Sequence, residues 1–140
     1  MPLTLAQAQA ILQAAVDAAR KANYKPMGIV VLDAAGHVKA FAREDGASMF
    51  RFEIAQGKAW AAVGMGASSR QLAMRAKDNP NLFVSLAATA AGKFLPQTGA
   101  VLIHSPEGEL LGAVGASGGT GDEDEAICIA GIQAVGLQVG

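Results

Sequence analysis

The sequence contains little charge and no cluster of basic residues. Only 16% of its 140 residues are charged, and the formal net charge is −1. Its nearest approach to a basic run is the pair Arg20 and Lys21. Proteins that bind nucleic acids need a basic patch to neutralise phosphates. We therefore expect no nucleic acid among the partners.

The chain also lacks the features of membrane proteins and of disulfide-bonded proteins. No apolar run approaches the roughly 20 residues that a membrane-spanning helix needs, and the N-terminus shows no basic segment followed by an apolar one. Cys128 is the only cysteine, so an internal disulfide is excluded. These absences favour a cytoplasmic protein with no membrane partner.

Residues that build common metal and nucleophilic sites are equally scarce. The two histidines, His37 and His104, lie far apart and show no spacing typical of zinc ligands, so we expect no metal site. Cys128 falls in a segment that we expect to be buried, which disfavours a nucleophilic role. The glycine-rich stretch at 117–121 matches neither a Walker motif nor a dinucleotide fingerprint.

Apolar residues, by contrast, are abundant. They make up 51% of a chain whose length is that of one domain, residues 1–140. This fraction is high for a small soluble protein, whose surface must be largely polar. We expect further copies of the chain to cover part of that surface, so that the protein is a homo-oligomer.

The order of predicted elements is helix, hairpin, helices, hairpin, helix. Without strand–helix–strand alternation, this order predicts an α+β fold with an antiparallel sheet. The predicted segments are a helix capped by Thr4 that ends at Asn23–Pro26, the strands Gly28–Asp33 and Val38–Arg43, a helix over Ala47–Met65, a helix from Ser68 or Ser69 to Lys77, a short helix Asn81–Ala91, a short edge strand Lys93–Leu95, the strands Gly99–His104 and Glu109–Ala116, and a final helix Asp122–Leu137.

Glycines inside two predicted helices indicate close packing. Gly57 costs its helix about 1 kcal/mol relative to alanine, which is tolerated where a neighbour needs the space. The final helix is apolar on nearly all sides, so we expect the sheet to bury it on one side and a neighbour on the other. Gly131 and Gly136 would permit that approach.

The stretch Gly108–Ile129 runs from a strand through a glycine loop into four consecutive acids, Asp122 to Glu125. One interpretation is a base or metal site centred on Asp124. The structural alternative is that acids in the first helical turn complement the helix dipole, by about 0.3–1 kcal/mol each. The acids would repel an anion, so we do not expect the loop to bind phosphate.

Two cations are further candidates for a site. Lys58 lies in an otherwise apolar helix, where it is either a general base or anion anchor, or a structural salt-bridge partner of Asp124 or Asp45. Arg43 follows a strand, where it is either a bidentate clamp for a carboxylate or a surface ion pair or subunit contact.

Three motifs, in order, resemble those of the GlcG-like, haem-degrading domain family. They are IVVLDAAGHVKAFA at Ile29–Ala42, with REDGA directly after it, EIAQGKA at Glu53–Ala59, and LGAVGASGGTGDEDE at Leu111–Glu125. The resemblance implies a profilin-like architecture, in which helices flank a five-stranded antiparallel sheet, and assembly into dimers up to octamers. The family includes a secreted haem-binding protein, the C-terminal domain of PduO-type adenosyltransferases, and proteins encoded beside genes of glycolate oxidation or aromatic catabolism.

The resemblance also implies a ligand cleft with haem as its best-known occupant. The cleft would include Phe94 and the loop residues Ser117, Gly118 and Gly119. The segment from Phe94 to Gly99 departs from the family's Gly-Gly-x-Pro turn. In the PduO-type domains the implied haem ligand is a histidine of the first helix, and the interior of that helix here contains no His, Met or Tyr.

Three functions are therefore open. The first is a binder of a small molecule or cofactor, such as haem, in bacterial catabolism. The second is an enzyme for a small organic acid or an aromatic-degradation intermediate, with Lys58 and Asp124 as acid or base, Arg43 as carboxylate anchor, and Ser117 beside them in a subunit-interface cleft. The third is an accessory or assembly subunit without a ligand.

Overall fold

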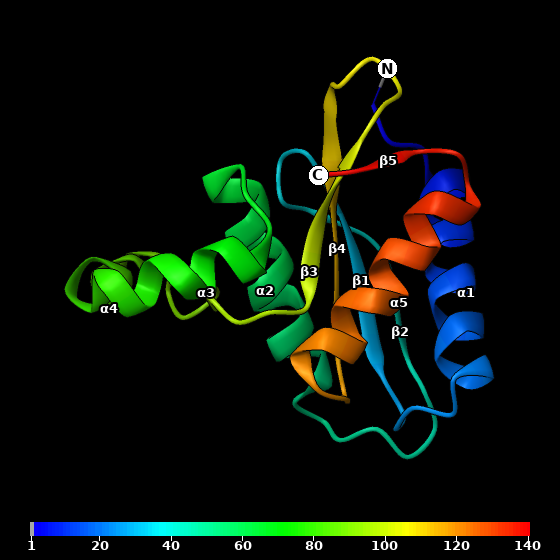
Figure 1. Ribbon diagram of the computed structural model, residues 1–140, viewed down its shortest axis with the longest axis horizontal. Coiled ribbons are helices and arrows are strands. Elements are labelled where there is room, and N and C mark those ends of the chain that lie inside the picture. The colour runs from blue at the N-terminus through cyan, green and yellow to red at the C-terminus, as the bar shows by residue number, and fades with distance from the viewer. Residues whose placement is uncertain (1) are drawn as a thin grey trace.

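The computed structural model describes residues 2–140, which form five helices and one five-stranded sheet (Figure 1). This architecture confirms the predicted α+β class. The elements are α1 (Leu5–Lys21), β1 (Gly28–Asp33), β2 (Val38–Arg43), α2 (Arg51–Met65), α3 (Ser69–Asp78), α4 (Pro80–Thr89), β3 (Ala100–His104), β4 (Leu110–Ser117), α5 (Gly121–Ala134) and β5 (Gln138–Val139).

The sheet has the strand order β2-β1-β4-β3-β5, and every neighbouring pair is antiparallel. The two predicted hairpins supply β1–β2 and β3–β4. The turn of the second hairpin is closed by the amide of Gly108, which donates to the carbonyl of Ser105. Pairing of β1 with β4 sets Gly28 opposite Ser117, so the start of one strand lies beside the end of the other.

Helices cover both faces of the sheet, with α1 and α5 on one side and α2 on the other (Figure 1). Side chains of a strand alternate between faces. Accordingly, Ile29 and Val31 of β1 join the core under α1 and α5, whereas Val30 and Leu32 join the core under α2. Burial on both sides thus explains the unbroken apolar run of this strand.

Helices α3 and α4 project sideways from the body of the molecule (Figure 1). A separate small core that includes Leu72, Phe83 and Phe94 packs them against α2. The buried hydroxyl of Ser69 accepts a hydrogen bond from the amide of Ala100, 2.8 Å away, and so ties α3 to the start of β3. No helix within residues 2–140 is long and apolar enough to cross a membrane.

Two predicted features of the chain's second half are wrong. Lys93–Leu95 forms no strand, because Leu95 instead donates a lone backbone hydrogen bond to Gly57 of α2. The sheet edge beside β3 is formed by β5 instead, and α5 ends at Ala134 rather than at Leu137. A two-residue strand is too short to leave a periodic pattern in the sequence.

The glycines of the helices behave largely as expected. A Cβ at Gly57 would lie 2.9 Å from Cβ of Leu95, and one at Gly131 would lie 2.7 Å from the carbonyl oxygen of Ile11 in α1. The expectation that Gly136 also permits close packing is wrong, since a Cβ at this position would meet nothing within 4 Å. Gly136 follows the end of α5 with a φ of +76°, a conformation that glycine adopts without strain.

Candidate functional site

A cleft of about 660 Å³ opens where α2, the end of β4 and the start of α5 meet. Its position follows from the register of β1 and β4, which brings the loop after Ser117 to the first turn of α2. The lining residues are Arg51, Ile54, Lys58, Leu95, Gln97, Thr98, Ser117, Gly119, Thr120, Gly121, Asp122 and Asp124.

A buried ion pair forms the floor of this cleft. The Nζ atom of Lys58 lies 3.0 Å from Oδ2 of Asp124, and the two residues are 5% and 2% exposed. Nζ also donates to the carbonyl of Ala116, and the amide of Gly119 donates to Oδ1 of Asp124 at 2.9 Å. The salt bridge that the sequence offered as the structural role of Lys58 is therefore present, and it links α2 to α5.

Gly99 makes room for the ammonium group. A Cβ at this position would lie 2.6 Å from Nζ of Lys58, and the φ of +141° is one that side-chain-bearing residues rarely adopt. Gly99 immediately precedes β3, and the absence of a side chain at this position allows Lys58 to reach Asp124.

The environment of Asp124 perturbs its ionisation. Burial raises the pKa of its carboxyl group, because the charged form loses solvation. The charge of Lys58 and the hydrogen bond from Gly119 oppose part of that rise. A carboxyl group with a raised pKa at the floor of a cleft is a common feature of functional sites.

Arg51 is a site residue that the sequence motifs did not reveal. It is the first residue of α2, and its Nη1 donates to Oγ of the buried Ser117 at 2.7 Å, while its Nε donates to Oγ of Ser48 at 3.1 Å. None of the ion pairs found within residues 2–140 involves Arg51. The sequence carries no signal for this role, because the predicted helix starts at Ala47 and so does not place Arg51 at a helix N-terminus.

Gly28 gives Arg51 its position. A Cβ on Gly28 would lie 2.6 Å from Cβ of Arg51, so a larger residue at the start of β1 would displace the first turn of α2. Because Gly28 also pairs with Ser117, the strand register places the guanidinium beside the serine hydroxyl.

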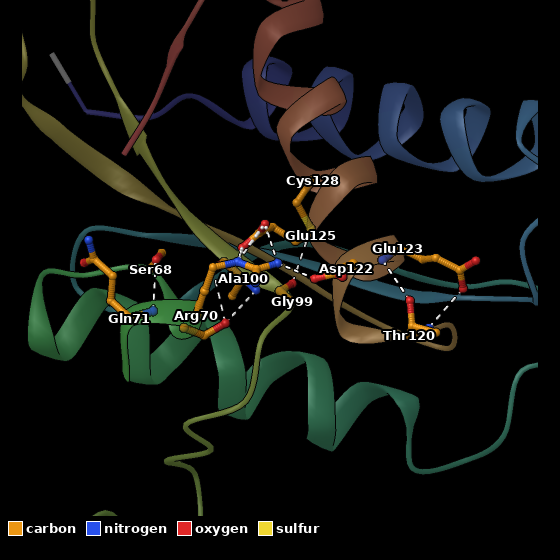
Figure 2. A network of polar contacts seen from close by, with 11 residues as sticks. Ser68, Arg70, Gln71, Gly99, Ala100, Thr120, Asp122, Glu123, Glu125 and Cys128 are labelled. Carbon is orange, nitrogen blue, oxygen red and sulfur yellow. Dashed lines mark hydrogen bonds and ion pairs between the residues drawn. The ribbon is translucent and has the colours of Figure 1, made fainter. Parts of the chain in front are cut away.

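The other acids of the cluster have structural partners. Figure 2 shows Arg70 of α3 reaching the first turns of α5, where it pairs with Asp122 and, at 3.1 Å from Nε to Oε2, with Glu125. Glu123 completes a capping box with Thr120, which also appears in Figure 2. Within residues 2–140, no three His, Cys, Asp or Glu side chains gather in an arrangement that would hold a metal ion.

The structure thus brings together Lys58, Asp124, Ser117 and Gly119, and it places three other predicted residues away from the lining. Arg43 lies on the surface, and its Nη1 donates to the carbonyl of Ala47 at 2.6 Å. Phe94 is buried against Phe83, with 5.8 Å between ring centroids, and its neighbour Leu95 lines the cleft instead. Gly118 packs against the backbone of Pro26.

Histidine and cysteine side chains contribute nothing to the lining. Cys128 is fully buried, its thiol donates to the carbonyl of Gly99 (Figure 2), and burial raises the pKa of that thiol. His37 lies in the exposed β1–β2 turn. These placements agree with the expectation that Cys128 is buried and unsuited to nucleophilic attack.

Comparison with known proteins identifies relatives over almost the whole chain. The family model described as haem degrading protein HbpS-like matches residues 3–133. No curated protein sequence matches the chain.

Solved structures give the same result. The crystal structure of a PduOC:haem complex superposes with a TM-score of 0.88 at 26% identity, covering 99% of this chain and 98% of the other. The structure of a double mutant of HbpS from Streptomyces reticuli gives a TM-score of 0.83 at 28% identity, covering 96% of this chain and 88% of the other. Protein ORFY from Klebsiella pneumoniae gives 0.85 at 25% identity, with coverages of 95% and 90%.

Proposed function

Since the chain belongs to the HbpS-like family of haem-degrading proteins, we propose that it is a small-molecule binding protein whose ligand occupies the cleft above Lys58 and Asp124. The observation that carries this proposal is the buried ion pair at the cleft floor. Removing two charges from water is costly, and a well-packed apolar pair would often give equal or greater stability. A function in the adjoining cleft accounts for keeping the charges there.

Haem is the ligand named for the PduOC relative, but the cleft residues of this chain do not suit it. Haem iron is held by side chains such as His, Cys, Met or Tyr. None of these lines the cleft, and none occurs in α1. Lys58 is already engaged by Asp124. We therefore propose that the occupant of this cleft is an organic molecule other than haem.

An enzymatic role is the second candidate, and the perturbed carboxyl group of Asp124 favours it. A carboxyl group whose pKa is raised by burial holds its proton more tightly and is better suited to exchange a proton with a bound substrate. Lys58 would then orient Asp124 and stabilise its charged form, because its ammonium already donates to Asp124 and to Ala116. The same cleft serves both candidates, and binding is the step they share.

A cleft-blocking substitution tests the proposal without disturbing the ion pair. Gln97→Trp places an indole at the exposed rim, and Gln133→Trp adds the same group at an exposed position of α5 outside the lining. Thermal unfolding is followed with acetate, pyruvate, benzoate, benzamide and other small neutral amides and alcohols as probes. We expect at least one probe to raise the Tm of the wild type and of the Gln133→Trp variant by a few degrees, but not that of Gln97→Trp. If no probe raises the Tm of the wild type, or if Gln97→Trp responds as the wild type does, the proposed function is wrong.

Haem is tested separately by absorbance titration of the Soret band. We expect no saturable one-to-one shift that Gln97→Trp abolishes. Stoichiometric haem binding that the tryptophan blocks would show that haem, and not another organic molecule, occupies the cleft.

A further inference from the structure

We propose that the cleft selects a small monocarboxylate with an apolar body, and that Arg51 is the residue that binds its carboxylate group. The inference rests on the proposed function, since it names the chemical class of ligand for the same cleft. Its support comes from the charges, the free hydrogen-bond donors and the apolar side chains of the lining.

The pairing of charges leaves one cation of the lining available. Lys58 is neutralised by Asp124 at 3.0 Å, and Asp122 pairs with Arg70 of α3. Within residues 2–140, Arg51 donates hydrogen bonds to the hydroxyl groups of Ser48 and Ser117 and forms no ion pair. A single anionic group is therefore what would neutralise the unpaired charge of the cleft.

The donors that remain on Arg51 match a carboxylate. A guanidinium carries five N–H groups in one plane. The Nε–H is directed to Ser48 and one Nη1–H to Ser117, which leaves the second Nη1–H and both Nη2–H groups. Arginine binds both oxygens of a carboxylate through N–H groups of this kind. Ser117, which is 1% exposed, fixes the orientation of the guanidinium and is a positioning residue.

Neighbouring acids disfavour a phosphate in the same place. Asp122, Glu123 and Asp124 all belong to the first turn of α5, beside the cleft. Their negative charges repel any anion, and the repulsion grows with the charge of the ligand. A phosphate dianion carries two negative charges, and the single unpaired guanidinium of the lining would neutralise only one of them beside these acids. The charge balance therefore selects a monoanion.

The body of the ligand is specified by two apolar side chains. Arg51, Ile54 and Lys58 follow one another at helical spacing on the face of α2 that lines the cleft. Leu95 adds a second apolar wall, held against α2 by its backbone bond to Gly57. A ligand whose carboxylate contacts Arg51 would lay its remaining atoms against Ile54 and Leu95, so an aromatic or branched aliphatic acid fits better than a second polar group.

The decisive experiment compares benzoate with benzamide, which has nearly the same shape and no charge. Affinities of benzoate, benzamide and inorganic phosphate are measured by calorimetry for the wild type, Arg51→Gln, Arg51→Lys and Arg75→Gln. Arg75 is an exposed arginine of α3 outside the cleft, so its substitution removes the same charge without touching the lining.

We expect the wild type and Arg75→Gln to bind benzoate at least tenfold more tightly than benzamide or phosphate. Arg51→Gln should lower the affinity for benzoate to that for benzamide and leave benzamide unchanged, which a general loss of structure would not do. Arg51→Lys should give an intermediate affinity, because lysine keeps the charge but loses the planar fork.

Three results would overturn the inference: equal binding of benzoate and benzamide by the wild type, full retention of benzoate binding by Arg51→Gln, or no benzoate binding at all. Its failure is distinguishable from failure of the proposed function. If neutral probes still bind and Gln97→Trp still blocks them, the cleft remains the ligand site and only the carboxylate class is wrong.

Discussion

Two cations on one face of α2 have different roles at the residue scale. Lys58 is buried and committed to Asp124, whereas Arg51 is only partly buried and is hydrogen-bonded to two serines. The sequence offers Asp124 or Asp45 as the salt-bridge partner of Lys58, and the structure shows that the partner is Asp124. The sequence points to Arg43 rather than Arg51 as the carboxylate anchor, because sequence order does not show that the chain from Gly46 to Phe50 carries the second arginine to the end of β4.

The ionisation of Asp124 gives a prediction about stability and pH. Because burial raises its pKa in the folded state, the folded protein binds more protons at this group than the unfolded chain, whose aspartate titrates near about 3.9. The contribution of Asp124 to the free energy of unfolding is therefore greatest below the pKa of the unfolded state. It declines as the pH rises through the raised pKa of the folded state. We expect the free energy of unfolding of the wild type, minus that of Asp124→Asn, to fall as pH increases above about 4.

Denaturant unfolding at several pH values measures this difference, and asparagine serves as the non-titrating reference. A difference that grows with pH would mean that Lys58 lowers the pKa of Asp124 more than burial raises it. If Asp124→Asn does not fold, NMR of the wild type can follow the chemical shift of the Asp124 carboxyl carbon across the same pH range. That titration shows directly whether the pKa of Asp124 is raised or lowered.

The single thiol supplies a second prediction at this scale. Burial excludes reagents from Cys128 and raises its pKa, so little thiolate is available. We expect one equivalent of thiol to react with iodoacetamide in denaturant and almost none in the native protein over the same time. Rapid alkylation of the native protein would contradict the burial of α5 against the sheet.

At the scale of elements, the sequence predicts most helices and both hairpins, because their caps, turns and apolar periodicities are local. Thr4 caps α1 with a capping box to Gln7, as expected. The start of α2 is less well predicted: it begins at Arg51 and not at Ala47, because the preceding residues form turns. The two residues of β5 have no local signal, since their pairing with β3 depends on where α5 delivers the chain.

Replacing glycine by alanine should lower the free energy of unfolding at one helix position and raise it at another. Gly131→Ala sets a methyl group against the backbone oxygen of Ile11 in α1, and overpacking of this kind costs about 1–3 kcal/mol. Gly64→Ala in α2 meets nothing within 4 Å and gains up to about 1 kcal/mol of helix propensity. Chemical denaturation of the two variants measures both effects. Stabilisation by Gly131→Ala would show that α1 and α5 lie farther apart than the structure has them.

The site depends on a third glycine in a similar way. Gly28→Ala should displace the first turn of α2 and with it Arg51, because the added methyl group would contact Cβ of that residue. We expect the affinity for benzoate to fall at least tenfold while the affinity for benzamide falls less. Calorimetry with both probes checks this, and an equal loss for the two would point to a general disturbance of the cleft.

At the scale of the whole molecule, large apolar side chains remain exposed on two regions. Phe41, Met49 and Phe50 lie on β2 and the segment that leads into α2, and Leu82 and Val84 lie on α4, with Met49 75% and Val84 70% exposed. A surface of this kind is typical of a protein that associates. We therefore keep the proposal that further copies of the chain cover it.

Light scattering at several concentrations tests this proposal. We expect a mass of at least two chains of 14.2 kDa, and a lower mass for a variant that combines Met49→Lys and Phe50→Lys, or for one that carries Val84→Lys. The matched control is Gln133→Lys, at an exposed polar position. A monomeric wild type would contradict the proposal, because it would show that no further copy of the chain covers these side chains.

The cleft above Lys58 and Asp124 is the centre of this account, and NMR can locate the ligand there directly. Benzoate is titrated into ¹⁵N-labelled protein while the backbone amide signals are followed. We predict saturable shifts concentrated at Ser117, Gly119, Thr120 and Gly121 and at the side chain of Arg51, with little change in α1 or the β1–β2 turn. Saturable shifts confined to surfaces away from these residues would show that the ligand site lies elsewhere and would contradict the account.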